Sequence, residues 1–387
     1  MNRLLSLLAG LSSLTLILGQ DYRVLDFNAT GNGIADDTNA VRAALAAAAA
    51  TNGGRVIFDY SRIFLTGCFQ VKKNVILDVR GMIKGSNLSD HYVFPGKNSS
   101  TWEPLIFGSN MKNITITGGG IIEGQGSIWP KLVYLYNTQD ITVYNITLRN
   151  SPMYNLAFEH VSNVHVYNVT ILNPDSFSTS NPSHNTDGVN MYGASNVLIE
   201  NSYISTGDDA IALYSGGCSY NASENVIVRN LTVGASHGLS IGSITCGGVR
   251  NVTFQDITID GSWIGVRIKS QRGRGGLVQN ITYSNIKMNN MNYCIQLTMN
   301  YSSTYIPPTS YNVTPHFQDI NVHDVTCNKG YYGWHLEGLD DSEINANFWN
   351  IQLTNYTNLY RNPCVHIYGT CDNSTVLPNC PSCMRIV

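Results

Sequence analysis

The chain has 387 residues, of which 43% are hydrophobic and only 13% are charged, and its formal net charge is −3. The charged share is about half of the quarter that is usual in soluble proteins. No basic run interrupts this near-neutral composition, which excludes nucleic acid as the expected partner. Many β-branched residues with abundant Asn and Gly indicate an extended β-protein with polar turns.

The first 19 residues have the pattern of a secretory signal peptide. Arg3 supplies a positive start, an apolar run follows from Leu4 to Leu18, and small Gly19 precedes the expected cleavage site. The alternative is a membrane anchor, but the run is shorter than the roughly 20 apolar residues that span a bilayer. We therefore expect a secreted, extracellular protein with no membrane attachment, whose mature domain is formed by residues 20–387.

A single helix is expected over residues 39–50, which are rich in Ala and place three apolar side chains on one face: Val41, Leu45 and Ala48. Asp36 and Asp37 resemble a catalytic pair, but their position directly before a helix favours a capping role. Asp37 or Thr38 is the expected cap. Such a helix would close the open end of a stacked repeat structure.

A repeat dominates the chain from Arg55 onward. Each unit begins with Asn or Asp, continues with Val or Ile, and then alternates apolar and polar residues like a strand. Units between Asp140 and Asn280 begin 23 to 33 residues apart, which is the length of one solenoid coil. One coil cannot bury its own apolar face, whereas stacked coils can. The repeat therefore predicts an all-β, single-domain, right-handed parallel β-helix with an N-terminal capping α-helix.

The Asn residues that begin these units predict a ladder of side-chain amides along one turn of the stack. Fourteen Asn-x-Ser/Thr sequons occur in the chain. Three of them, at Asn113, Asn251 and Asn280, coincide with ladder positions, which gives them a structural explanation. Others, such as Asn28 and Asn373, are candidates for glycans if the chain follows a eukaryotic secretory route.

The nine cysteines fit a secreted protein. Four of them crowd into the last residues, which predicts a disulfide-bonded C-terminal end: Cys364, Cys371, Cys380 and Cys383. A zinc site at Cys380 and Cys383 is the alternative, disfavoured because secreted chains usually oxidise such pairs. An odd number leaves at least one thiol free or paired with another chain.

Chemically active residues gather in four motifs on four successive repeat units: Asn185-Thr186-Asp187, Gly207-Asp208-Asp209, Ser236-His237-Gly238 and Arg267-Ile268-Lys269. Residues at the same phase of neighbouring coils lie side by side, because neighbouring strands are about 4.8 Å apart. We therefore expect the four motifs to form one site.

The direction of each side chain follows from strand alternation. Asn185 and Asp187 are two residues apart, so in a strand they would share a face. Asp208 and Asp209 are adjacent and would point to opposite faces, unless they lie at a strand end or bulge. Gly207 directly before them makes such an irregularity easy.

The residue types indicate hydrolysis of an acidic polysaccharide. Cleaving a glycosidic bond takes one protonated carboxyl group and a second, ionised one. Three neighbouring carboxylates cannot all ionise cheaply, so one pKa rises and that group becomes the acid. Arg267 and Lys269, two apart on one strand face, would bind an anionic sugar. The alternative is that these cations only neutralise the aspartates.

In this order and at this spacing, the four motifs resemble the signatures of the polygalacturonases, glycoside hydrolase family 28. The resemblance covers most of the chain and includes the Gly31–Thr38 opening and the glycine-rich segments Gly118–Gly120 and Gly124–Gly126. It implies an inverting, single-displacement hydrolysis of α-1,4-galacturonosyl linkages in polygalacturonan. It implies no cofactor and no metal, and we expect a monomer.

The resemblance also assigns catalytic roles. Asp208 matches the family's general acid, while Asp187 and Asp209 match the pair that holds and activates water. His237 matches the residue that tunes the protonation of the acid and orients the substrate.

The substrate-binding residues come from the same resemblance. Arg267 and Lys269 match the cations that bind galacturonate carboxylates beside the scissile bond. Asn185 matches a residue that positions the sugar, and Tyr301 matches a substrate-contacting tyrosine on a later coil.

The sequence departs from the family pattern in three places. Asn190 and Ala210 stand where many members carry Asp and Cys, so one familiar disulfide is absent or rerouted, and Cys218 with Cys246 is an alternative pair. The segment Arg272–Gly276 looks more like bacterial-type and exo-acting members. Its two arginines either add to anion binding or only decorate a loop.

Three other functions stay open at this point. A hydrolase of rhamnogalacturonan or xylogalacturonan would keep the fold and mechanism. A calcium-dependent pectate lyase would use the aspartates as metal ligands. A non-catalytic glycan-binding β-helix would keep the cations but would not need three carboxylates and a histidine. The choice between internal and chain-end attack depends on loops whose shape the sequence does not reveal.

Overall fold

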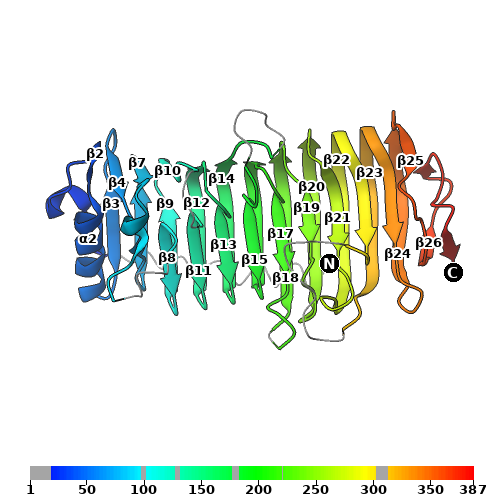
Figure 1. Ribbon diagram of the computed structural model, residues 1–387, viewed down its shortest axis with the longest axis horizontal. Coiled ribbons are helices and arrows are strands. Elements are labelled where there is room, and N and C mark those ends of the chain that lie inside the picture. Colours follow the sequence, from blue (N-terminus) through cyan, green and yellow to red (C-terminus); the bar gives the residue numbers. More distant parts are fainter. Residues whose placement is uncertain (1–18, 97–101, 127–130, 177–182, 220, 302–312) are drawn as a thin grey trace.

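The computed structural model describes residues 19–96, 102–126, 131–176, 183–219, 221–301 and 313–387. The described chain forms one elongated stack of coils, with the helix α2 (Thr38–Ala50) at one end and the C-terminal strands at the other (Figure 1). Strands of neighbouring coils pair in parallel along the stack. The predicted parallel β-helix with an N-terminal capping helix is confirmed.

Two 3-10 helices, η1 (Val24–Phe27) and η2 (Ser89–Tyr92), accompany α2. The strands are β1 (Asp21–Arg23), β2 (Asn32–Asp36), β3 (Gly54–Phe58), β4 (Ile63–Thr66), β5 (Phe69–Gln70), β6 (Val75–Val79), β7 (Met82–Gly85), β8 (Ile106–Ser109), β9 (Lys112–Thr117), β10 (Ile121–Glu123), β11 (Val133–Tyr136), β12 (Gln139–Arg149), β13 (Leu156–Glu159), β14 (Ser162–Leu172), β15 (Val189–Tyr192), β16 (Ser195–Ser205), β17 (Ile211–Tyr214), β18 (Ser223–Val233), β19 (Leu239–Ile241), β20 (Val249–Asp260), β21 (Ile264–Lys269), β22 (Leu277–Thr298), β23 (His316–Glu337), β24 (Ile344–Thr354), β25 (Asn358–Tyr360), β26 (Ile367–Cys371), β27 (Val376–Leu377) and β28 (Met384–Ile386).

One row of short strands runs along the stack, and the candidate site lies on it. It consists of β8, β11, β13, β15, β17, β19 and β21, each hydrogen-bonded to the next. The row continues into the C-terminal part of β22 and then of β23. Residues far apart in sequence are therefore neighbours along this row.

Aliphatic columns fill the interior, because the inward residue of each coil pairs in register with that of the next. Every side chain in one such column is at most 1% exposed: Ile141, Val164, Val197, Val226, Val252 and Ile281. Full burial of an aliphatic side chain stabilises the fold by about 1.5–3 kcal/mol. The core is therefore as continuous as the stack itself.

The predicted amide ladder is present. Asn225 donates its side-chain amide to Asn196 at 3.3 Å and accepts that of Asn251 at 3.2 Å, and the same bond joins Asn280 to Asn251 at 2.9 Å. These residues have φ between 54° and 57°, in the left-handed region that Asn tolerates better than most residues. The ladder holds the turns in register at the point where the backbone bends.

At the N-terminal cap the structure corrects one detail. Asp37 is the residue before α2, but its carboxylate accepts the backbone amides of Thr30 and Gly31 rather than capping the helix. Asp36 instead accepts the amide of Thr38 at 3.0 Å. Both aspartates are thus structural, as predicted, because each satisfies backbone donors of the opening segment.

Four disulfides join the chain: Cys218–Cys246, Cys294–Cys327, Cys364–Cys383 and Cys371–Cys380. The disulfide-bonded C-terminal end is confirmed, and the zinc alternative at Cys380 and Cys383 is wrong because these thiols pair with other cysteines. The Cys218–Cys246 pair is also confirmed. Cys68 is the free, buried thiol.

The predicted signal peptide lies outside the described residues, except for Gly19, and stays a prediction. Within the described part of the chain, no helix has the length and apolar character that crossing a membrane would require.

The ladder gives a first testable prediction. Asn225→Gly removes two ladder hydrogen bonds but keeps the left-handed backbone, so we expect a loss of about 1 kcal/mol. Asn225→Ala removes the same bonds and leaves a Cβ in the left-handed conformation without the short polar side chain that makes it tolerable, at a further cost of about 1–2 kcal/mol. Thermal and urea unfolding of both variants measure the difference. Equal destabilisation would show that the backbone conformation does not matter here.

Candidate active site

The site is built where strands of the row begin. Asp187, Asp209 and His237 each lie two residues before the first paired residue of β15, β17 and β19 respectively. Arg267 and Lys269 lie within β21, the next strand along (Figure 1). Parallel register thus brings the four sequence motifs onto four neighbouring coils, as predicted.

The aspartate pair sits in the expected irregular segment before β17. Gly207 is required there by close packing, because a Cβ at this position would lie 2.2 Å from the Ser183 carbonyl oxygen. One carboxylate oxygen each of Asp208 and Asp209 and one ring nitrogen of His237 all lie within 4.8 Å of one another. Both adjacent carboxylates therefore face the same site.

Asn185 differs from the prediction. Neither Asn185 nor Asp187 is in a strand, since β15 begins only at Val189. Asn185 is exposed and has a φ of 53°, whereas Asp187 is only 3% exposed. The alternation of a strand does not apply to a turn, so the predicted common face was wrong.

Asp209 is the electrostatic centre of the site. Its carboxylate is 1% exposed and accepts Lys269 Nζ at 2.8 Å and Arg267 Nη1 at 3.2 Å, with the Ser240 hydroxyl at 2.5 Å. The two cations reach one carboxylate together, which confirms that they share a face of β21. Removing one partner of such a buried arrangement leaves an uncompensated charge.

Asp208 is paired differently. Its Oδ1 lies 3.1 Å from His237 Nδ1, and His237 Nε2 lies 3.3 Å from the Ser176 hydroxyl. Burial alone would raise the pKa of Asp208, but the hydrogen bond and charge of His237, with help from Lys269 and the Asp209 amide, hold this pKa at about 2. Its side chain is 24% exposed, so Asp208 is the carboxylate that ligands reach most easily.

Asp187 is the carboxylate without a cation: among the described residues, no Lys or Arg forms an ion pair with it. Asn190 donates to it at 2.7 Å. Burial, together with the charges of Asp208 and Asp209, raises the pKa of Asp187 well above its usual value, and the Asn190 hydrogen bond offsets only part of this effect. Of the three carboxyl groups, Asp187 is therefore the one whose surroundings most favour the protonated form.

Tyr301 lies beside the two cations; its predicted contact with substrate stays a prediction. Its ring centroid lies 5.2 Å from Lys269 Nζ and 5.5 Å from the Arg267 guanidinium carbon. These are distances at which a cation is attracted to an aromatic face. The segment is anchored by the Tyr301 amide, which donates to the Ser270 carbonyl at 2.9 Å.

The two arginines after β21 have different environments. Arg272 lies on the surface and pairs with Asp340 and Asp341, so it joins two loops. Arg274 is fully buried and donates to the Ser243 hydroxyl at 3.1 Å. Its Nε and Nη2 atoms have no hydrogen-bond partner among the described residues.

Several contacts of the site were not found from the sequence. Ser240 supports Asp209, Asn190 supports Asp187, and Gln296 accepts Arg267 Nε at 2.9 Å. The strand register could have identified two of these contacts, because Ser240, Arg267 and Gln296 occupy one position on three successive coils. Such polar residues are common elsewhere in the chain, so only their coil positions distinguish them.

Residues 59–367 match the model of the glycosyl hydrolases family 28, a span that includes all four motifs. The chain belongs to this family. Family 28 membership makes it a glycosidase and confirms the resemblance seen in the motifs.

Relatives of this family 28 chain include a probable polygalacturonase of Vitis vinifera, 28% identical over 86% of this chain and 73% of the relative. Polygalacturonase QRT2 of Arabidopsis thaliana is 31% identical over 73% of this chain and 66% of its own length. The fold also matches the crystal structure of a hyperthermoactive exopolygalacturonase from Thermotoga maritima, with a TM-score of 0.75 and 22% identity, over 91% of this chain and 88% of that one.

Asp208, Asp209 and His237 are close enough together to hold a cation. The electrostatics of the family 28 site oppose this, because both Asp209 oxygens already accept hydrogen bonds from Arg267 and Lys269. Calcium prefers six to eight oxygen ligands and would meet two positive charges here. The donor set therefore suits ion pairing better than calcium binding.

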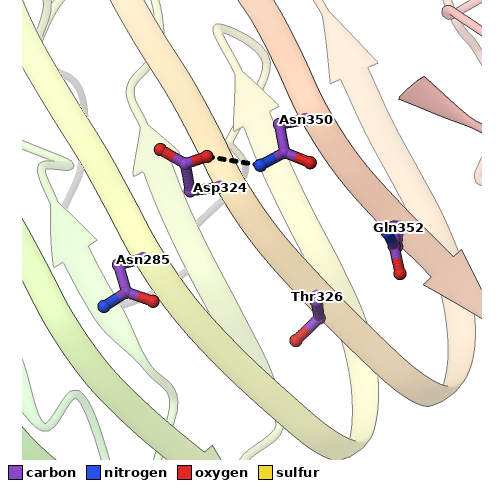
Figure 2. Close-up of a pocket in the computed structure, with 5 residues that line it drawn as sticks. All are labelled: Asn285, Asp324, Thr326, Asn350 and Gln352. Carbon is purple, nitrogen blue, oxygen red and sulfur yellow. Dashed lines mark hydrogen bonds between the residues drawn. The ribbon is translucent and has the colours of Figure 1, made fainter. Parts of the chain in front are cut away.

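A second hollow lies across β22, β23 and β24, on the segment of β22 that pairs with β20 and on the neighbouring segments of the next two strands (Figure 2). Its lining residues belong to the turns and outer faces of β22, β23 and β24: Asn285, Asp324, Thr326, Asn350 and Gln352. Asn350 donates to Asp324 across the hollow, as in the amide ladders. With a single carboxyl group in its lining, the hollow lacks the pair that glycoside hydrolysis needs.

The buried ion pairs give a second prediction. Asp209→Asn removes the counter-charge of Arg267 and Lys269, so we expect it to destabilise the protein by about 3 kcal/mol. The matched control is Asp208→Asn, the same change at the adjacent, more exposed position, where the expected loss is smaller because one partly exposed histidine, rather than two buried cations, loses its partner. Thermal unfolding at neutral pH compares the two. A smaller loss for Asp209→Asn than for Asp208→Asn would contradict this assignment.

Proposed function

We propose that this chain is a secreted, monomeric hydrolase that cleaves α-1,4-galacturonosyl linkages of polygalacturonan. One observation carries the substrate class: two buried cations, Arg267 and Lys269, meet the single carboxylate of Asp209. The positive charge left over suits the carboxylate of a uronate sugar, and the Tyr301 ring beside both cations suits packing against the sugar. The similarity to polygalacturonases supports the same substrate class.

The extracellular location is supported by two features. The signal-like pattern of the first 19 residues directs secretion, and four disulfides are typical of an oxidising compartment.

In the proposed inverting reaction, water attacks the anomeric carbon while the bond from that carbon to the glycosidic oxygen breaks. Asp187 and Asp209 hold the water, and one of them takes its proton. Asp209 is paired with two cations, whereas Asp187 can act as a base only when it is ionised, and its raised pKa moves that condition to higher pH. If Asp187 takes the proton, activity is expected to fall as the pH drops through its raised pKa.

The acid in this proposal is Asp208 acting together with His237. Their hydrogen bond joins His237 Nδ1 to Asp208 Oδ1, and the step requires His237 as the imidazolium, which becomes neutral when it gives up its Nδ1 proton. Transfer of that proton to Asp208 and then to the leaving oxygen completes the cleavage. The exposure of Asp208 supports this role, because the acid must touch the glycosidic oxygen.

The order of the pKa values favours one alternative assignment, in which Asp187 is the acid and Asp208 the base. Burial and the two neighbouring carboxylates raise the pKa of Asp187, whereas His237 outweighs the effect of burial and lowers the pKa of Asp208. Against it stands the burial of Asp187, which is 3% exposed and bonded to Asn190.

An activated leaving group separates the two assignments. A nitrophenyl oligogalacturonide needs little help from an acid, so the acid variant keeps activity on it while losing activity on the natural linkage by about 10²–10⁴-fold. We expect this behaviour from Asp208→Asn. The matched variant Asp187→Asn is expected to lose activity on both substrates. The reverse result would make Asp187 the acid.

The overall reaction is tested by product analysis on polygalacturonic acid in the presence of a chelator. We expect reducing ends without ultraviolet-absorbing products, undiminished by the chelator and lost in Asp208→Asn, with inverted anomers in fresh proton NMR spectra. Monomer from the start indicates exo action, and a ladder of oligomers indicates endo action. Unsaturated, chelator-sensitive products would point to a lyase instead. If reducing ends appeared only with rhamnogalacturonan or xylogalacturonan, that polysaccharide would replace polygalacturonan as the assigned substrate.

A further inference from the structure

A chain of hydrogen bonds leads away from the site across three neighbouring coils. Arg267 Nε, whose guanidinium also bonds Asp209, donates to Gln296 Oε1 at 2.9 Å. Gln296 Nε2 lies 2.8 Å from His335 Nδ1, and His335 Nε2 lies 3.3 Å from Glu337 Oε2. Arg267, Gln296 and His335 occupy the same register position on β21, β22 and β23, which lie side by side (Figure 1).

The donors and acceptors in this chain fix one protonation state. Arg267 can only donate, so the Gln296 oxygen must face it, and the amide nitrogen must face His335. An amide nitrogen also only donates, so His335 Nδ1 must accept and carries no proton. The Glu337 carboxylate accepts, so the proton of His335 is on Nε2. The bonds are satisfied only by the neutral Nε2–H tautomer.

We propose that His335 is a positioning residue for the substrate-binding cation. As the neutral Nε2–H tautomer it orients the Gln296 amide, and the amide holds Arg267 in the position from which it binds a uronate carboxylate. This inference rests on the role of Arg267 in the proposed function.

Protonation of His335 would break the arrangement. A proton on Nδ1 would face the Gln296 N–H, which places two donors 2.8 Å apart. Rotating the amide by half a turn relieves that contact but presents an N–H to Arg267 Nε instead. One hydrogen bond is lost in either orientation, and the rotated amide costs Arg267 its acceptor, so charging His335 weakens the hold on Arg267.

The surroundings of His335 favour the neutral form. Burial lowers its pKa from the usual value, and the positive charges of Arg361 and Arg267 act in the same direction. Glu337 opposes them, while the Tyr293 ring packs beside the imidazole with centroids 5.7 Å apart. His335 thus stays neutral down to a more acidic pH than a free histidine.

Glu337, the last residue of this series of hydrogen bonds, is connected back to the site through Asn300 and Tyr301. Glu337 also accepts hydrogen bonds from the side-chain amide of Asn300 at 2.8 Å and from the Thr298 hydroxyl at 3.3 Å. Asn300 directly precedes Tyr301, whose ring lies against Arg267 and Lys269. The network therefore supports both sides of the proposed uronate site.

Two substitutions test the hydrogen bonds at Nδ1 and Nε2 of His335 one at a time. His335→Asn keeps an acceptor near the Nδ1 position and cannot titrate, so we expect a near-normal KM for oligogalacturonides that stays flat between about pH 4 and pH 7. His335→Gln keeps a donor toward Glu337 but loses that acceptor, so KM is expected to rise about tenfold at every pH. In the unchanged protein KM rises about tenfold toward the acid end, with kcat less affected.

His323→Asn is the matched control. His323 stacks on Trp349 and bonds Asp324, on the strand segments that carry the second hollow. The same chemical change there is expected to leave the pH dependence of KM unaltered. A wild-type acid rise in KM that persists in His335→Asn, or a normal KM in His335→Gln, would overturn the proposal.

A second measurement needs neither substrate nor variant activity. In protein labelled with ¹⁵N-histidine, the signals absent from His335→Asn identify His335, and we expect an unprotonated Nδ1 with a protonated Nε2 at neutral pH. The Nδ1–H tautomer, or a charged ring, would overturn the proposal. If the tautomer is as expected but no galacturonan is cleaved, the proposed function fails and the assignment of the network stands.

Discussion

Parallel register between coils is the constraint on which the rest of this structure depends. Each strand of the row that carries the site is hydrogen-bonded to the next, so a side chain is placed by its coil and by its phase within that coil. A slip of one residue would turn every such side chain to the other face. The amide ladder around Asn225 opposes a slip, because its bonds form only when the turns are aligned. Stability and catalytic geometry thus share one cause.

Within that frame, unequal neighbours make three similar carboxyl groups different. Asp209 meets two cations, Asp208 meets His237, and Asp187 meets only an amide. The cations come from β21, two coils beyond the aspartate pair in register. Burial magnifies each difference, since a low local dielectric strengthens both attraction and repulsion. The scaffold therefore sets the protonation pattern by choosing which charge each carboxyl group faces.

The fold and the site's members were predictable because they depend on patterns that repeat. The coil anchors recur at regular spacing, and the four motifs fall on successive units, so Asp187 and Lys269 could be brought together without a structure. Finer geometry was not predictable. The left-handed turn at Asn185 and the contact of Asp36 rather than Asp37 with the helix depend on local backbone angles. A pattern of apolar and polar residues does not encode those angles.

The hydrogen bonds that link Arg267, Gln296 and His335 could not be predicted from the sequence. Gln296 follows Arg267 by 29 residues, but His335 follows Gln296 by 39, because the coil between them is longer. A search at constant spacing therefore misses His335. Its role is also invisible in its residue type, since the neutral tautomer follows only from the partners on both sides. Sequence motifs identify the groups that we propose touch substrate, whereas the groups proposed to orient them are found only from register and hydrogen-bond direction.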